Sequence, residues 1–187
     1  MTYRKRQPNR DRRGFTLAET LLALLILLLA TAVTATGLPV ALRAYHDVVD
    51  AANAEVLLST TMTALRDELG SAEGFALEDD DTLDYYKSSS LQGRSVDLKS
   101  YDGSGDDGYM GIKIENAGLS RELVSNAAAT RRLHAEFSKI TYDKINQVFV
   151  VSGLQVKKNS NGNVMSEAPS EYLIRPMNPT IIGDSEG

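Results

Sequence analysis

The feature that most constrains this chain is a run of 23 uncharged residues, Thr20–Leu42, near its N-terminus. Seventeen of these residues are Ala, Val, Ile or Leu. A helix of about 20 apolar residues spans the hydrocarbon core of a bilayer. A helix that is apolar on every side cannot be covered by a globular body of this size. The run therefore predicts a transmembrane helix.

Charge is distributed unevenly on the two sides of this run. Residues 1–13 carry six basic side chains and one acidic one, a net charge of +5. The other 174 residues carry 14 basic and 24 acidic side chains, a net charge of −10. The positive-inside rule places the basic end in the cytoplasm and the acidic body outside. The acidic body also argues against nucleic acid as a partner.

A secretory signal peptide is a competing interpretation of the same segment. Such a peptide has a basic start, about 7–15 apolar residues and a small-x-small cleavage site. Val33-Thr-Ala35 supplies such a site, and cleavage after Ala35 would release a secreted domain that begins at Thr36. The length of the apolar run and the helical pattern after it favour a retained helix.

One carboxylate lies at the start of the apolar segment. Glu19 is the only charged residue between Arg13 and Arg43. A buried carboxylate is costly unless it meets a cation, so a residue in this position is a functional candidate. Thr16 and Glu19 also have the spacing of a capping box, in which both side chains satisfy free N–H groups at a helix N-terminus. The residues alone leave both roles open.

The segment Gly14–Glu19 (GFTLAE), between a basic leader and a long apolar run, resembles the class III signal of type IV prepilins and pseudopilins. The resemblance implies that a membrane prepilin peptidase cuts between Gly14 and Phe15, and that Phe15 is then N-methylated. It also implies that Glu19 is needed for assembly, where it meets the N-terminal amine of a neighbouring subunit. Pro39 departs from the family's pattern, in which many members place a proline a few residues earlier.

The helical pattern continues beyond the apolar run as a heptad-like stripe that ends at Gly70, a natural C-terminal stop. Its members are Val48, Ala51, Glu55, Leu58, Met62, Leu65 and Leu69. Gly37 and Pro39 leave two arrangements open, because a proline removes a helical hydrogen bond. Either one helix runs from Phe15 to Leu69, or two helices meet at residues 37–39.

The C-terminal part of the chain has the alternating pattern of short strands. The expected strands are 82–86, 95–98, 110–115, 135–142, 147–157 and 171–175, with a turn at 159–163. Residues 120–134 are expected to form a short helix or an ordered loop. The prediction is therefore an α+β fold, with a long and partly transmembrane N-terminal helix and a small antiparallel β-sheet head, as the pilin resemblance also implies.

These patterns divide the chain into four parts. They are a basic leader (1–14), a transmembrane and assembly helix (15–42), an amphipathic continuation of that helix (43–70), and an acidic loop region with a β-sheet head (71–187).

The acidic segment 78–108 carries nine carboxylates against three basic side chains. Asp102, Asp106 and Asp107 lie on a Gly-rich loop, where clustered carboxylates suit a calcium ion. The match to a calcium loop is partial, since Asp107 occupies the place of the glycine and Lys113 that of the closing glutamate. We therefore predict a solvated acidic loop, no metal site and no cofactor.

The sequence contains no Gly-rich phosphate loop, no HExxH and no GxSxG motif. His46 and His134 are expected on the surface. The prediction is a structural protein and not an enzyme: a subunit of a type IV pilus or a related secretion or uptake filament. Its acidic body and 6% aromatic content favour a minor pilin or pseudopilin.

The partners expected from the resemblance are prepilin peptidase, other pilin or pseudopilin subunits and the cytoplasmic membrane. The chain is expected to cross that membrane once, with its N-terminus inside and its head outside, and to reach a surface filament after assembly. Two alternatives stay open: a membrane-anchored extracytoplasmic binding protein that does not polymerise, and a secreted domain cut after Ala35.

Overall fold

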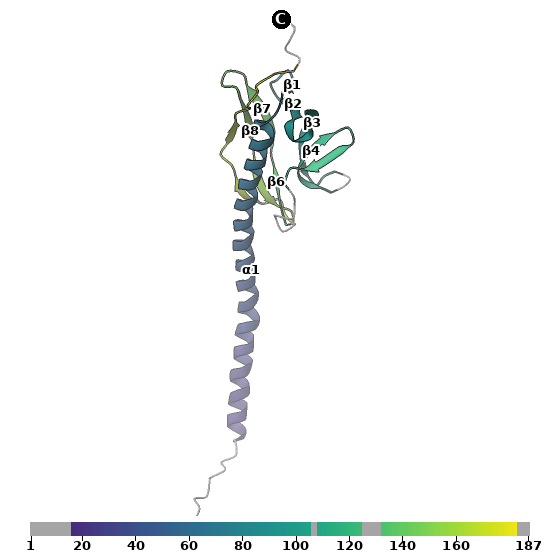
Figure 1. Ribbon diagram of the computed structural model, residues 1–187. Helices are drawn as coiled ribbons and strands as arrows, with labels where there is room; N and C mark the ends of the chain where they lie inside the picture. Colours follow the sequence, from purple (N-terminus) through teal and green to yellow (C-terminus); the bar gives the residue numbers. More distant parts are fainter. Residues whose placement is uncertain (1–15, 106–107, 125–131, 183–187) are drawn as a thin grey trace, which may run out of the picture. The chain divides into compact units, whose positions relative to one another are not determined.

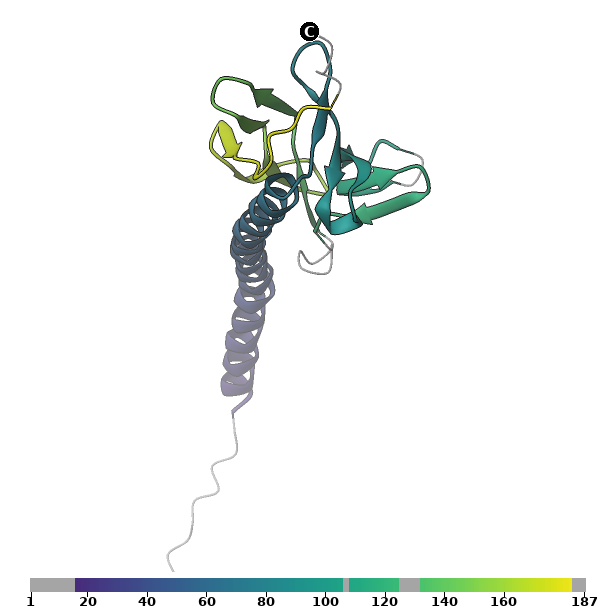
Figure 2. The same cartoon turned by 45° about the horizontal axis from the view of Figure 1, so that its top comes forward.

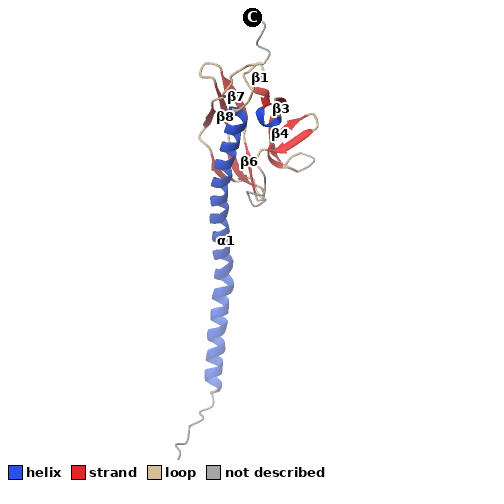
Figure 3. Cartoon of the chain, viewed as in Figure 1, coloured by secondary structure: helices blue, strands red, loops and turns tan. Residues whose placement is uncertain are grey.

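A computed structural model describes residues 16–105, 108–124 and 132–182 (Figure 1). One long helix, α1 (Leu17–Gly70), precedes all of the strands, and Figure 3 separates the two kinds of element by colour. The predicted α+β fold, with a long N-terminal helix and an antiparallel sheet region, is confirmed. The chain divides into two compact units, Met1–His46 and Asp47–Gly187, and α1 contributes residues to both.

In the first unit, α1 runs through Gly37 and Pro39 without interruption. Of the two arrangements left open by the sequence, one continuous helix is therefore observed. The large apolar side chains of this segment are exposed, from 78% at Leu17 to 50% at Leu42. This unit therefore buries none of its apolar run within the chain.

In the second unit, five strands form an antiparallel sheet in the order β1-β2-β3-β4-β5. They are β1 (Phe75–Leu77), β2 (Leu83–Ser88), β3 (Arg94–Asp102), β4 (Met110–Asn116) and β5 (Leu119–Glu122), with a 3₁₀ turn, η1 (Ser89–Leu91), after β2. The expectation of a helix or loop over 120–134 is wrong at both ends, because β5 pairs with β4 and a further strand begins at Leu133. Residues 125–131 of that segment lie outside the described residues.

Two smaller antiparallel sheets complete the second unit, in the orders β10-β9-β6 and β11-β8-β7. Their strands are β6 (Leu133–Glu136), β7 (Lys139–Asp143), β8 (Val148–Ser152), β9 (Gln155–Lys158), β10 (Val164–Glu167) and β11 (Glu171–Ile174). The single strands expected at 135–142 and 147–157 are each two strands that belong to different sheets. A turn at the expected place, 159–163, joins β9 to β10.

The break in both of these long strands occurs where Ser138 faces Gly153. Ser138 N donates a hydrogen bond to Ser152 O at 3.0 Å. Gly153 has a φ of +67°, and a Cβ atom there would collide with Ser138 Oγ. The close approach and the left-handed backbone turn the chain from one sheet into the other at this point.

The sheets and the C-terminal part of α1 enclose one apolar core. Phe75 lies at its centre, with its ring centroid 4.5 Å from that of Tyr142 and 4.7 Å from that of Phe149. Leu65 and Leu69 of α1 are fully buried in the same core. Tilted and edge-on aromatic packing of this kind adds to the free energy gained from burying the rings.

The buried face of α1 agrees with the predicted stripe only in part, at Leu58, Leu65 and Leu69. Its members are Asp50, Ala54, Leu57, Leu58, Thr61, Leu65, Glu68, Leu69 and Gly70. Val48, Ala51 and Glu55 were expected in the stripe but are exposed. The stripe was chosen for apolar residues, whereas the buried face includes two carboxylates that find partners in the sheets.

These carboxylates, Asp50 and Glu68, are 18 residues apart, which is five full turns of an α-helix and so the same face. Asp50 Oδ2 lies 2.8 Å from Lys158 Nζ and 3.2 Å from Arg132 Nη2. Both cations come from the β6–β9 pair or the residue beside it. The C-terminal part of α1 is thus bound to the sheets by charge as well as by apolar contact.

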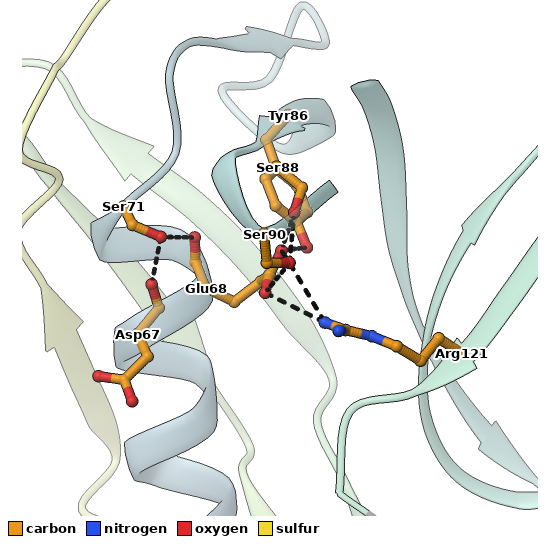
Figure 4. A network of polar contacts seen from close by, with 7 residues as sticks. All are labelled: Asp67, Glu68, Ser71, Tyr86, Ser88, Ser90 and Arg121. Atoms are coloured by element: carbon orange, nitrogen blue, oxygen red, sulfur yellow. Dashed lines mark hydrogen bonds and ion pairs between the residues drawn. The ribbon is translucent and has the colours of Figure 1, made fainter. Parts of the chain in front are cut away.

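Glu68 lies in a network of hydroxyl groups near the end of α1 (Figure 4). It accepts hydrogen bonds from Ser88 Oγ, from Ser90 Oγ at 3.0 Å and from Tyr86 OH at 3.3 Å. Arg121 Nη2 of β5 approaches Glu68 Oε2 to 3.4 Å. Burial and the neighbouring Glu68 raise the pKa of Tyr86 well above its usual range, so its hydroxyl keeps its proton and donates.

Candidate functional site

The candidate site begins where α1 begins, at Thr16 and Glu19. Thr16 N donates to Glu19 Oε2 at 3.0 Å, and Glu19 N donates to Thr16 Oγ1 at 3.3 Å. Thr16 Oγ1 also donates to Glu19 Oε2, at 3.2 Å. This is the reciprocal geometry of a capping box, so the local role that the spacing predicted is present.

The capping box uses only one oxygen of the Glu19 carboxylate. Both hydrogen bonds that Thr16 donates end on Oε2, and Oε1 accepts none from the described residues. The side chain is exposed. A cation can therefore approach Oε1 while the cap stays intact, so the two roles considered for Glu19 are compatible.

The threonine hydroxyl groups of the apolar run form hydrogen bonds within the helix itself. Four threonine hydroxyls donate to carbonyl oxygens three or four residues earlier, at 2.8–3.1 Å: Thr20 to Leu17, Thr31 to Leu28, Thr34 to Ala30 and Thr36 to Ala32. A hydroxyl without a partner would be costly in an apolar environment. The run therefore presents no unsatisfied hydroxyl group to lipid or to a neighbouring helix.

Within the described residues, α1 is the one helix long and apolar enough to cross a membrane, judged by length and composition. Its apolar window lies near the N-terminus, and none of that window is buried. A long apolar N-terminal helix of this kind fits a single-pass membrane anchor.

Comparison with protein families gives one match. Residues 9–35 match the prokaryotic N-terminal methylation motif, which spans the end of the basic leader, the Gly14–Phe15 junction and about two thirds of the apolar run. The chain has a type IV pilin-like N-terminus. No curated protein and no solved structure matches it significantly.

The motif indicates how the N-terminal segment is processed. A prepilin signal implies processing by prepilin peptidase and association with the membrane, and it points to a structural protein and not to an enzyme. Gly14 and Phe15, between which cleavage is predicted, lie outside the described residues. The cleavage position, the N-methylation of Phe15 and the assembly role of Glu19 therefore stay predictions.

The possible calcium loop has no support from the described residues. Asp102 Oδ1 accepts hydrogen bonds from Ser104 Oγ at 2.6 Å and from Ser104 N at 3.0 Å, which lower the pKa of Asp102. Asp106 and Asp107 lie outside the described part of the chain. Among the residues described, no group of three or more His, Asp or Glu side chains is placed to hold a metal ion.

Two carboxylates of the acidic segment that follows α1 form ion pairs while their side chains stay partly exposed. Asp80 Oδ2 lies 2.7 Å from Lys139 Nζ, and Asp81 Oδ1 lies 2.8 Å from Lys144 Nζ. Hydrogen bonds from Lys139 and Thr82 hold the pKa of Asp80 well below its usual range. The turn between β1 and β2 is thereby tied to β7 and to the residue after it, and two of its carboxylates are held in ion pairs.

The two histidines differ. His46 is exposed on α1, as predicted, whereas His134 is 4% exposed and the surface prediction is wrong for it. His134 Nδ1 lies 2.7 Å from Asn159 Oδ1, and its Nε2 lies 3.5 Å from Glu136 Oε2. His134 belongs to β6, whose residues 133–135 are all buried, and its ring nitrogens lie close to a side chain of the turn after β9 and a side chain of β6.

Two buried carboxylates of the second unit, Asp50 and Glu68, were not predicted from the sequence. Each is a charged residue on the buried side of an amphipathic helix. Its partners come from distant parts of the chain, so the helix sequence alone does not identify them. The available signal was their spacing of 18 residues, which places both on one helical face together with Leu57 and Leu65.

Proposed function

We propose that this chain is a structural subunit, a minor pilin or pseudopilin, of a type IV pilus or a related secretion or uptake filament. The observation that carries the proposal is the match of residues 9–35 to the methylation motif, followed directly by an exposed apolar helix. A minor or pseudopilin role is favoured by the acidic body and the low aromatic content of 6%.

The exposed apolar run explains why the protein would assemble. From Leu17 to Leu42, every large apolar side chain is at least half exposed, so this segment requires an environment from outside the chain. Lipid supplies it before assembly, and the helices of neighbouring subunits supply it afterwards. The same surface thus serves as a membrane anchor, predicted to place residues 1–14 inside and the head outside, and then as an assembly interface.

Glu19 would provide the specific contact within this interface. Cleavage after Gly14 creates a positive amine on Phe15, and Glu19 Oε1 of a neighbouring subunit is free of described hydrogen bonds. Pairing the amine with this carboxylate removes the cost of holding a lone charge among apolar helices. The capping box on Oε2 would orient the carboxylate for that contact.

The mature N-terminus tests the proposal. We expect intact-mass measurement and N-terminal peptide mapping of the protein from its native membrane to find a chain that begins at N-methylated Phe15. A chain that retains residues 1–14 would favour the membrane-anchored binding protein that does not polymerise. A chain that begins at Thr36 would favour the secreted domain, and either result would refute the proposed function.

A bulky substitution of Gly14 provides the matching control. Gly14→Leu should leave the leader uncut, because the peptidase requires the small residue at this position in the family that the signal resembles. Unchanged removal of the leader from this variant would exclude cleavage at the Gly14–Phe15 bond.

A further inference from the structure

A second cationic feature of the molecule lies away from the N-terminus, at the end of α1. An open hollow of about 530 Å³ is lined by residues from the last turns of α1 and from the segment after β11. Its lining residues are Arg66, Asp67, Gly70, Ser71, Arg175 and Met177. The hollow therefore contains two guanidinium groups and one carboxylate, a net charge of +1.

The two arginines are held in place by the fold. The Arg66 guanidinium lies 5.9 Å from the ring centroid of Tyr172, whose hydroxyl donates to Met62 O at 2.9 Å. Arg175 directly follows β11, and the next segment is fixed to the helix because Met177 N donates to Gly70 O at 2.8 Å. The Arg66 side chain is thus positioned by Tyr172, and the backbone that carries Arg175 is fixed to the end of α1.

Neither guanidinium forms an ion pair with a carboxylate of the described residues. The single described interaction of Arg66 is its contact with the Tyr172 ring, and Arg175 has no described partner. Asp67 lines the same hollow but makes no ion pair with either arginine in the described part of the chain. In Figure 4 the Asp67 carboxylate points away from the Glu68 network. Within the described residues, the positive charge of the hollow therefore stays available to an acidic group from outside.

An acidic feature lies on the same unit. The turn between β1 and β2 carries Glu78, Asp79, Asp80 and Asp81, and it projects from the strands in Figure 2. Asp80 and Asp81 are paired with Lys139 and Lys144. The side chains of Glu78 and Asp79 are exposed and form no ion pair with the described residues. Among the described residues, the unit thus offers two adjacent carboxylates and two guanidinium groups that form no ion pair.

The backbone of the turn is also held by hydrogen bonds. Glu78 N donates to Thr82 O at 2.8 Å, and Tyr142 N donates to Asp81 O at 2.9 Å. With the two lysine pairs, these bonds fix the backbone from which Glu78 and Asp79 extend. Two rigid patches of opposite charge on one molecule suit a head-to-tail contact between copies, which produces an open helical filament when the rotation does not close a ring.

We propose that the Arg66–Arg175 hollow of one subunit receives the Glu78–Asp79 carboxylates of a second copy of this chain. This inference rests on the proposed function, since it requires that copies of the chain lie side by side in a filament. It assigns to the sheet-bearing unit a contact that is separate from the apolar helix and from Glu19.

Charge reversal in the full-length chain tests this contact. Arg66→Glu with Arg175→Glu, and separately Glu78→Arg with Asp79→Arg, should each lower incorporation into the filament fraction about tenfold, a loss of about 1.4 kcal/mol. Combining all four substitutions restores opposite charges and should return incorporation to within about twofold of the wild-type level. Asp84→Arg with Arg94→Glu, two exposed residues outside both patches, is the matched control and should incorporate normally.

The outcomes separate this inference from the proposed function. If the wild-type chain is processed but never enters a filament, the proposed function fails and the inference fails with it. If the wild type assembles while the hollow variant incorporates equally well, only the inference is wrong. Loss in the hollow variant without loss in the turn variant, or a combined variant no better than either parent, also refutes pairing with a second copy. Equal resistance of each variant to limited proteolysis in the membrane fraction verifies that the second unit folds.

A crosslinking measurement gives a second, independent readout. The sequence contains no cysteine, so engineered cysteines react without background. Copies carrying Asp79→Cys and Arg175→Cys, expressed together and treated in cells with a short bis-maleimide, should give a crosslinked dimer. The pair Asp84→Cys and Arg94→Cys should give none. Absence of the first dimer from cells that contain assembled subunits would contradict the contact.

Discussion

Among the buried and half-buried ionisable residues, Glu136 has one of the most complete sets of partners. Its Oε1 lies 2.6 Å from Lys157 Nζ and 2.8 Å from Gln155 Nε2, while Oε2 lies 3.5 Å from His134 Nε2. Burial alone would raise the pKa of Glu136, but the hydrogen bonds from Lys157 and Gln155 outweigh it. The net effect lowers the pKa below its ordinary value of 4.5.

This shift predicts a loss of stability in acid. Because the folded state binds the proton less tightly than the unfolded state, the contribution of Glu136 is complete above about pH 4.5 and is lost as the pH falls through the folded-state pKa. Glu136→Gln should therefore be less stable than wild type at neutral pH, and the difference should shrink on acidification. Urea unfolding of the detergent-solubilised chain, followed by the fluorescence of its eight tyrosines, measures this. A difference independent of pH would contradict the prediction.

At the level of the elements, the point where the two long strands divide depends on one glycine. Gly153 combines a φ of +67° with a close approach to Ser138, whereas Gly162 has a φ of +68° and no atom within 4 Å of the Cβ position. Gly162→Ala should lower the free energy of unfolding by about 1–2 kcal/mol, the cost of the left-handed conformation. Gly153→Ala should cost about 1–3 kcal/mol more, because the added methyl group must displace Ser138.

Urea unfolding of the two alanine variants measures this difference directly. The two glycines share nearly the same backbone conformation, so the comparison isolates the collision. Equal losses of unfolding free energy in both variants would mean that the segment around Ser138 moves aside at no energetic cost. The division of the two strands would then not require a glycine at position 153.

The same region marks the limit of prediction from sequence. Alternating apolar residues placed strands correctly near 110–115 and 171–175, because alternation is a local property of one strand. It did not reveal that 135–142 and 147–157 each divide between two sheets. That division depends on how Ser138 and Gly153 face each other, which is a contact between segments.

The helix gives a similar contrast. The capping box at Thr16 and Glu19 was predictable because both partners lie within one turn. The buried face of the C-terminal part of α1 was predicted only in part, since Asp50 and Glu68 are buried by partners 18 to 108 residues away. An apolar pattern cannot identify a charged residue that is buried because of a distant cation.

At the scale of the whole molecule, a substitution of Glu19 at the start of α1 should affect assembly without affecting membrane insertion. Glu19→Ala should leave insertion intact, because the apolar run is unchanged, while incorporation into filaments falls. Removing one partner of a buried ion pair costs about 3–5 kcal/mol, which corresponds to more than about a hundredfold in an equilibrium constant. Comparing the membrane and filament fractions of cells that express the variant measures both effects.

Thr16→Ala is the matched control for this variant. It removes the hydroxyl that caps the helix but leaves the Glu19 carboxylate and its free Oε1 in place. Loss of a cap costs about 1 kcal/mol, so incorporation should fall far less than in Glu19→Ala. Similar losses in the two variants would assign Glu19 to helix capping alone, and normal incorporation of Glu19→Ala would remove its assembly role.

The two buried carboxylates of α1 have a consequence for how the chain rejects wrong packing. A purely apolar helix face loses little when it slides along a sheet by one turn, about 5.4 Å, so several alignments would compete. Here such a shift would separate Asp50 from Arg132 and Lys158. It would also separate Glu68 from Arg121 and from the hydroxyl groups that donate to it. Each abandoned buried charge costs several kcal/mol. Asp50 and Glu68 lie five turns apart, and only one alignment of the helix on the sheets gives both carboxylates their partners.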